Sequence, residues 1–321
     1  LSGLVGSEMC IRDRYYIDKD GTAYKASFVQ GAIQLVRTQA PAVITDLGSD
    51  AHTNTHVSVG VTGARTTTET TATAPATPSK PSHTFEETTH TTASGTVTGR
   101  ATTETVHEIG SNGSTSTARE TRTYAGADRL TSITAEATKT HGATTESSSQ
   151  HVTISPNGVP SAATTTHKLV EPGHTRTETS TQTMRADGSI KRQVDETSDH
   201  QDAIAGHPKA PAKPAVDTHS TSTTHFDTEG LPTSADATTT TTSGTATHTE
   251  TSRTTFANGV PTHTHSDATT TAHTTDREGN PVSSTDHTIT DVSMNRDGKP
   301  IKIHTDALST THSTDNTHAT I

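Results

Sequence analysis

Most of the chain alternates with a period of two, and the repeated residue is threonine rather than an apolar one. Residues 245–265 read TATHTETSRTTFANGVPTHTH, with threonine at every second position from Thr245 to Thr251. In a β-strand alternate residues lie on opposite faces, so these threonines would share one face. Asn258-Gly259 favours a two-residue hairpin turn, because both positions tolerate positive φ. The pattern therefore predicts a β-hairpin centred on this dipeptide.

A second pattern recurs between the threonine-rich segments. It consists of an apolar residue, a short spacer that ends in Asn, Asp or Glu, and then Gly, often with Pro two positions later. Each Gly is expected to mark a turn. The uneven spacing fits hairpins with arms of different length better than a strict solenoid. The pattern occupies residues 109–113, 154–160, 184–188, 226–232, 256–261 and 294–300, with 276–281 as a variant.

The composition excludes an ordinary hydrophobic core. Only 26% of the 321 residues are hydrophobic and 2% are aromatic, against roughly 45–50% apolar residues in typical globular proteins. The 76 threonines favour strands, because a branched Cβ suits a pleated surface. We predict an all-β, elongated and irregular array of threonine-rich hairpins. The alternative is a largely disordered low-complexity chain.

The chain divides where its composition changes. Residues 15–74 form an N-terminal segment, in which the spacing of Phe28, Val29, Ile33 and Val36 predicts a helix over residues 26–37. Proline-rich linkers are expected at residues 75–82 and 206–216. The threonine-rich hairpin repeats are then expected to occupy residues 83–205 and 217–321.

The first residues look foreign to the rest of the sequence. Residues 4–14, LVGSEMCIRDR, resemble a translated transposon-type sequencing adapter, so residues 1–14 are expected to be an artefact. Cys10 is the single cysteine of the chain. Without it, disulfides, cysteine zinc ligands and cysteine nucleophiles are excluded.

The turn pattern of residues 100–321 resembles the β-hairpin repeats of RHS/YD-type secreted bacterial proteins, which carry an aromatic residue, an Asp and a Gly at comparable places. The resemblance implies a β-hairpin array associated with surface display or toxin encapsulation. This sequence lacks the Tyr-Asp pair and the aromatic residues of the arms. The closed shell of that family is therefore not expected here.

No pattern in the sequence indicates an enzyme, and no catalytic, cofactor-binding or metal-binding residues are predicted. Asp18-Lys19-Asp20-Gly21-Thr22 resembles the first motif of HAD-type phosphotransferases, but the α/β domain which that chemistry needs does not follow, and a turn is the better interpretation. No P-loop, GxGxxG or GxSxG motif is present.

Charge and histidine content limit the partners. The formal net charge of −11 argues against nucleic acid, and no run reaches the ~20 apolar residues of a membrane span. Of the 21 histidines, His263 and His265 would share a strand face, as would His52 and His56. Without an HExxH motif we interpret them as solvated face residues rather than as metal ligands.

We therefore expect a structural or adhesive repeat protein of a cell or virion surface, located outside the cell, which could self-associate or bind a surface ligand. Two alternatives remain. Clustered Thr, Ser and Pro, with one N-glycosylation acceptor at Asn112, are typical of a disordered O-glycosylated spacer. The Thr-x-Thr arrays also resemble the flat surfaces of ice-binding sheets.

The histidine content predicts self-association near pH 6. Protonation of all 21 histidines would change the formal charge from −11 to +10, mostly between roughly pH 7.5 and 5.5. Repulsion between chains is least where the charge passes through zero. Light scattering from pH 5 to 8 should peak near pH 6 without metal. A peak that requires added zinc would instead indicate bridging by histidine, and a flat trace would contradict both explanations.

Overall fold

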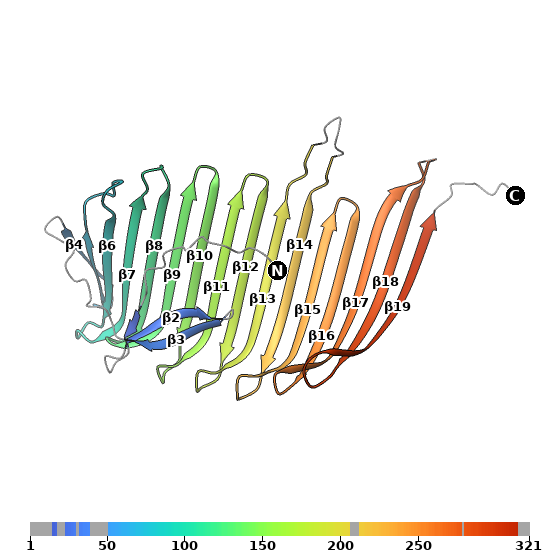
Figure 1. Ribbon diagram of the computed structural model, residues 1–321. Coiled ribbons are helices and arrows are strands. Elements are labelled where there is room, and N and C mark those ends of the chain that lie inside the picture. The colour runs from blue at the N-terminus through green and yellow to red at the C-terminus, as the bar shows by residue number, and fades with distance from the viewer. Residues whose placement is uncertain are drawn as a thin grey trace.

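The computed structural model describes residues 15–17, 23–29, 32–38, 51–205, 212–277 and 279–313, and these residues form strands and turns without a helix. Strands β4 to β19 make one open, 16-stranded antiparallel sheet, in which each strand pairs with its neighbours in sequence (Figure 1). Strands β1 to β3 form a separate three-stranded sheet. The all-β prediction is confirmed.

The strands are β1 Tyr15–Ile17, β2 Ala23–Val29, β3 Ala32–Thr38, β4 His52–Val59, β5 Arg65–Ala72, β6 Ser82–Thr91, β7 Val97–Ile109, β8 Thr115–Ala125, β9 Arg129–His141, β10 Thr144–Ile154, β11 Pro160–Glu171, β12 His174–Met184, β13 Ile190–Gln201, β14 Val216–Phe226, β15 Pro232–Ser243, β16 Ala246–Ala257, β17 Val260–Thr275, β18 Pro281–Met294 and β19 Pro300–Ser313.

The two faces of the large sheet have different compositions. One face, here called the threonine face, carries the odd-numbered threonines of β12 from Thr175 to Thr183 and, through the cross-strand register, the odd-numbered residues of β16 such as Thr247. The other, here called the alanine face, carries Ala163 on β11 and Ala237 on β15. The predicted alternation of threonine with other polar residues is thus the alternation between two faces.

The sheet is a single layer with almost no interior. Among the described residues only Ile154 and Ala163 are buried apolar residues, and both lie on or beside the alanine face near the middle strands. Cohesion therefore comes from the backbone ladders and from cross-strand side-chain pairs. Threonine hydroxyl groups pair across strands, for example Thr103 with Thr121 at 3.1 Å and Thr254 with Thr264 at 2.9 Å. Such pairs contribute roughly 0.2–1 kcal/mol each.

Eight connections share one five-residue geometry. The N–H of the first residue donates to the carbonyl of the fifth, and the N–H of the fourth, always a glycine, donates to the carbonyl of the first. All eight glycines have positive φ, as the predicted turns require. An Asn or Asp side chain fixes several loops, as where Asp227 Oδ1 accepts from Leu231 N at 2.9 Å. These loops are residues 60–64, 92–96, 110–114, 155–159, 185–189, 227–231, 276–280 and 295–299.

The register explains the Pro of the recurring pattern. In four of these loops the apolar residue before the loop pairs with the residue just after it across a shift in register, as in Ile154 with Pro160 and Phe226 with Pro232. Proline lacks an N–H and is tolerated at bulges and at the first residue of a strand. Each of these prolines begins its strand.

The predicted turn at Asn258-Gly259 is confirmed. These two residues join β16 to β17 with φ values of 51° and 76°, as expected for a two-residue hairpin turn with left-handed central residues. Thr247 and Thr249 lie on one face of β16 and His248 on the other, as the sequence predicted.

The helix predicted over residues 26–37 is wrong. Ala23–Val29 and Ala32–Thr38 are instead antiparallel strands, with Phe28 opposite Ile33. The prediction rested on the helical spacing of apolar residues alone. Gly31 lies in the middle of this segment, and Val29, Ile33 and Val36 are β-branched. Both features disfavour a helix, and the β-branched residues favour strands.

The large sheet continues across both proline-rich segments. β5 pairs with β6 across residues 75–82, and β13 pairs with β14 across residues 206–216. They are therefore connections between adjacent strands of one sheet. Residues 1–14 and 18–22 lie outside the described residues; the strands that flank 18–22 pair with each other, Ile17 opposite Ala23.

The turn geometry predicts unequal effects of two substitutions in one hairpin. Gly259→Val should destabilise the sheet by about 1–3 kcal/mol, because it forces a β-branched residue to positive φ, and a Cβ at this position would lie 3.3 Å from Leu231 Cδ2. Thr249→Val removes only a hydroxyl paired with Thr240 at 3.3 Å, and should cost less than about 1 kcal/mol. Urea unfolding measures both values.

Gly259→Asn is the control for the backbone effect. Asparagine adds a Cβ but tolerates positive φ better than valine, so its cost should lie between those of the other two variants. Equal destabilisation by Gly259→Val and Thr249→Val would mean that residues 257–260 do not form a tight turn.

Candidate functional site

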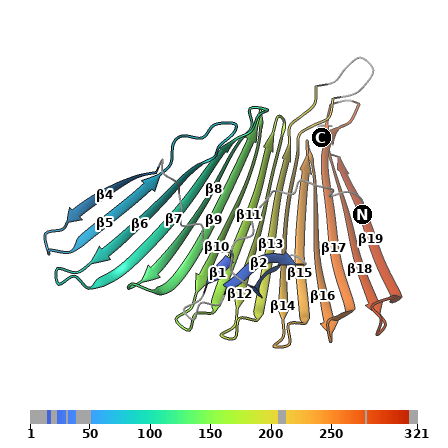
Figure 2. The ribbon, with the colours of Figure 1, turned by 60° about the vertical axis from the view of Figure 1, so that its left-hand side comes forward.

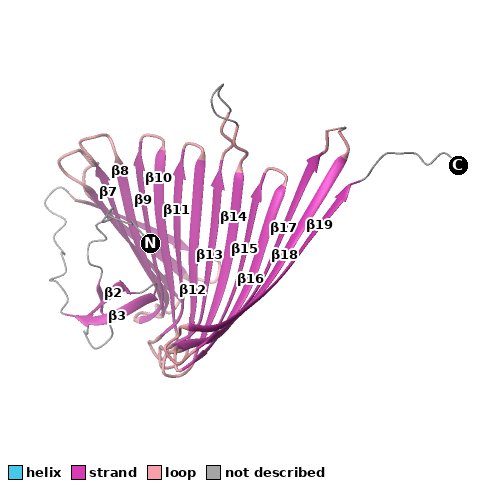
Figure 3. Ribbon diagram, turned by 45° about the vertical axis from the view of Figure 1, so that its right-hand side comes forward, coloured by secondary structure: helices cyan, strands magenta, loops and turns pink. Residues whose placement is uncertain are grey.

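The titratable side chains that lie closest together on the threonine face form a set of histidine–carboxylate pairs. Each side chain in these pairs is more than a third exposed, and the pairs come from strands β13 to β19, which lie side by side in Figure 3. Their spacing follows from the antiparallel register, which places side chains from adjacent strands opposite one another. The pairs are His200–Asp217, His219–Glu196, His263–Asp291, His265–Asp291, His287–Asp267 and His304–Asp306.

Asp291 on β18 is the centre of one cluster. Its Oδ1 lies 2.9 Å from His265 Nδ1 and 3.4 Å from His263 Nε2, both on β17. The hydrogen bond from His265 lowers the pKa of Asp291, and the charges of His263 and His304 lower it further. The sequence predicted that His263 and His265 share a face, and this is confirmed; the aspartate between them was not predicted.

His200 bridges two carboxylates at the end of β13. Its Nδ1 lies 2.6 Å from Asp217 Oδ1, and its Nε2 lies 3.1 Å from Asp202 Oδ1. The hydrogen bond to Asp217, followed by that to Asp202, raises the pKa of His200. Both ring nitrogens donate only when the imidazole is charged. The arrangement therefore favours the protonated histidine.

The geometry of the histidine–carboxylate pairs is poorly suited to acid–base catalysis. Catalytic acid–base groups need a site that excludes water and holds a reacting atom, whereas His265 and Asp291 are about half exposed. Among the described residues no group of three or more His, Cys, Asp or Glu side chains could hold a metal ion. His52 and His56 share a face of β4 and are both exposed. The pairs are thus suited to responding to pH.

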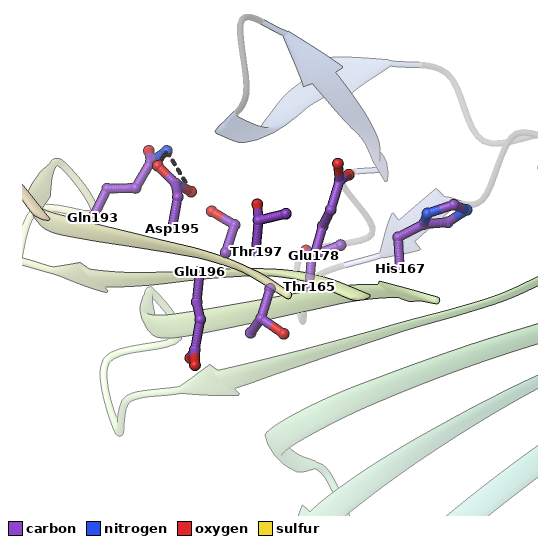
Figure 4. A pocket seen from close by; sticks show the side chains of 9 residues that line it. Thr165, His167, Glu178, Gln193, Asp195, Glu196 and Thr197 are labelled. Atoms are coloured by element: carbon purple, nitrogen blue, oxygen red, sulfur yellow. Dashed lines mark hydrogen bonds between the residues drawn. The ribbon is translucent and has the colours of Figure 1, made fainter. Parts of the chain in front are cut away.

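A shallow depression lies on the alanine face over β11 to β13, with a volume of ≈ 320 Å³. Figure 4 shows Gln193, Asp195 and Glu178 on one side of these strands and Glu196 on the other. Gln193 Nε2 donates to both carboxylate oxygens of Asp195, at 3.0 and 2.8 Å. This bond joins two of the nine lining residues, and a third, His167, lies with its Nε2 3.0 Å from Glu146 Oε1.

The sequence analysis missed the apolar character of the two outer strands. Among the described residues eight large apolar residues are exposed, and five of these lie on β4 and β19. Val57 and Val59, like Ile301 and Ile303, follow the strand period of two, but this period does not tell an outer strand from an inner one. The described residues also contain no helix of the length and apolarity needed to span a membrane.

No protein-family model matches the chain, and no curated protein matches it. A porin-like protein from Bacteroides uniformis ATCC 8492 is similar at 14% sequence identity, over 73% of this chain and 90% of that protein, with a TM-score of 0.14. A score this low does not establish a shared fold. No function is inferred from it.

The position of His200 predicts a stability that depends on pH. Because its pKa is raised in the folded state, the protonated form stabilises the sheet, fully at pH values below the unfolded pKa and less as pH rises through the folded pKa. His200→Asn should therefore destabilise the protein more at pH 5.5 than at pH 8.5. Urea midpoints at the two pH values measure the difference.

His225→Asn is the matched control. His225 lies exposed on β14, on the same threonine face as His200 of β13, and makes no ion pair among the described residues. Its replacement should have a similar, small effect at both pH values. The interpretation of His200 would be refuted by two variants with the same pH profile.

Proposed function

We propose that the chain is a non-enzymatic structural or adhesive protein of a cell or virion surface, and that the extended sheet carries this function. The observation that carries the proposal is a 16-stranded layer with only two buried apolar residues in the described part of the chain. An enzyme needs a concave, water-excluding site built on a packed scaffold. A single layer instead offers length and two accessible faces.

The dimensions support a structural role. Sixteen strands spaced 4.7–4.9 Å apart span roughly 70 Å, with strands of about 40 Å across. Both faces carry hydroxyl, histidine and carboxylate groups on a regular grid, so the sheet presents the same chemistry along its length.

The structure favours this proposal over the two alternatives. A disordered spacer would not need eight loops with one shared hydrogen-bond pattern. An ice-binding sheet must match a planar lattice, but this sheet is strongly twisted, and β4 and β5 run at a steep angle to β18 and β19 (Figure 2). The threonine hydroxyls also bond to one another across strands.

The test is whether a single chain in dilute solution is an ordered, elongated sheet. Circular dichroism should show strong β signal that is lost on addition of urea, and small-angle X-ray scattering should give a particle about 70 Å long. Latex beads coated with the protein then test adhesion to cells, with heat-denatured protein as the unfolded control. A coil spectrum with rapid proteolysis would reject the proposal.

A further inference from the structure

The two outer strands of the sheet are unusually apolar for exposed edges. Val57 and Val59 on β4, and Ile301 and Ile303 on β19, are each more than half exposed. An outer strand also presents unpaired N–H and C=O groups that can pair with another strand. The described residues place no strand on the outer side of β4 or β19.

The usual protection against edge pairing is weak here. Proteins commonly place charged residues, above all lysine, on exposed edges. Strand β4, HTNTHVSV, contains no Lys, Arg, Asp or Glu. On β19, Lys302 and Asp306 lie on the threonine face, and Ile301, Ile303 and Ala307 lie on the alanine face. The alanine side of both edges is therefore uncharged.

The two edges are also complementary in position. By the register across the sheet, Val57 and Val59 lie on the alanine face, the same face as Ile301 and Ile303. Both pairs lie at the same end of the sheet, because loops 60–64 and 295–299 each follow an even-numbered strand of the meander. A second copy beside β19 in the same orientation would present its β4 antiparallel to β19.

We propose that copies of this chain join edge to edge, with β19 of one copy pairing antiparallel with β4 of the next and so continuing the sheet. One register places Ile303 opposite Val57 and Ile301 opposite Val59, because both pairs are two residues apart and run in opposite directions. The same register places Thr305 opposite Thr55, which repeats the cross-strand threonine pairs inside the sheet.

The contact is heterologous, so growth does not stop at two copies. Each added chain uses its β4 and leaves a free β19, which produces an open filament rather than a closed dimer. This inference extends the proposed structural function but does not depend on it. The dilute-solution measurement above concerns one chain, so either proposal can fail while the other stands.

Two lysine substitutions test which apolar residues hold copies together. Ile303 on β19 is 64% exposed and Ile204, away from both edges, is 61% exposed, so Ile303→Lys and Ile204→Lys make the same change at similar exposure. Sedimentation velocity over a concentration series should show oligomers of the unchanged chain. Ile303→Lys should weaken association roughly ten- to hundredfold. Ile204→Lys should leave it within about twofold.

Cross-linking tests the register. In full-length chains that carry Cys10→Ser, a Thr55→Cys variant is mixed with a Thr305→Cys variant and oxidised. Directly opposite residues have Cβ atoms close enough for a disulfide, so this mixture should give a disulfide-linked heterodimer. Thr53→Cys mixed with Thr305→Cys, two residues out of register on the same face, should give much less.

The outcomes are decisive in both directions. Register-specific cross-linking together with selective weakening by Ile303→Lys supports the proposal. A chain that stays monomeric throughout the concentration series overturns it. So does equal weakening by the two lysine variants, or equal cross-linking of the two mixtures, because each would show association that does not use these edges.

Discussion

The structure depends on hydrogen bonds between backbones of adjacent strands. In most proteins of this size a buried core offsets the conformational entropy of folding. Here the two buried apolar residues in the described part of the chain cannot do so, and the 15 strand junctions of the large sheet take that role. Threonine suits such a sheet because its branched Cβ favours the strand conformation and its hydroxyl bonds across strands. The residues of the turns therefore specify the fold more strongly than the residues of the two faces, because each turn fixes the register of two strands.

This arrangement explains how a low-complexity sequence can specify one fold. On the faces threonine, serine, histidine and acidic residues occupy equivalent solvated positions, and exchanges among them leave the backbone ladder intact. The loops demand particular residues: a glycine at positive φ in all eight, an Asn or Asp that accepts from the loop backbone in several, and a proline at a shift in register in three. The information that sets the fold is concentrated at the strand ends.

The parts of the fold that could be predicted are those with local causes. The period of two fixed which residues share a face, and Asn258-Gly259 and the recurring Asx-Gly pattern identified turns, because turn geometry is decided within five residues. Loops 60–64 and 92–96 were not predicted, because they lack an Asn, Asp or Glu before the glycine. The helix over residues 26–37 failed because apolar spacing outweighed Gly31 and the β-branched residues. The carboxylates that pair with His265 and His200 could not be predicted. They depend on the register between two adjacent strands, and the sequence of one strand alone does not determine that register.

The meander connectivity has a consequence for how the chain reaches this state. Every strand of the large sheet pairs only with those just before and after it in sequence. Arg192 and His225, which pair across the connection between β13 and β14, are 33 residues apart in the sequence. Low contact order permits rapid folding, and a structure without a shared interior can be completed in stages. Each hairpin could dock on its predecessor as the polypeptide leaves a ribosome, so the leading strands would be in place before the last are made.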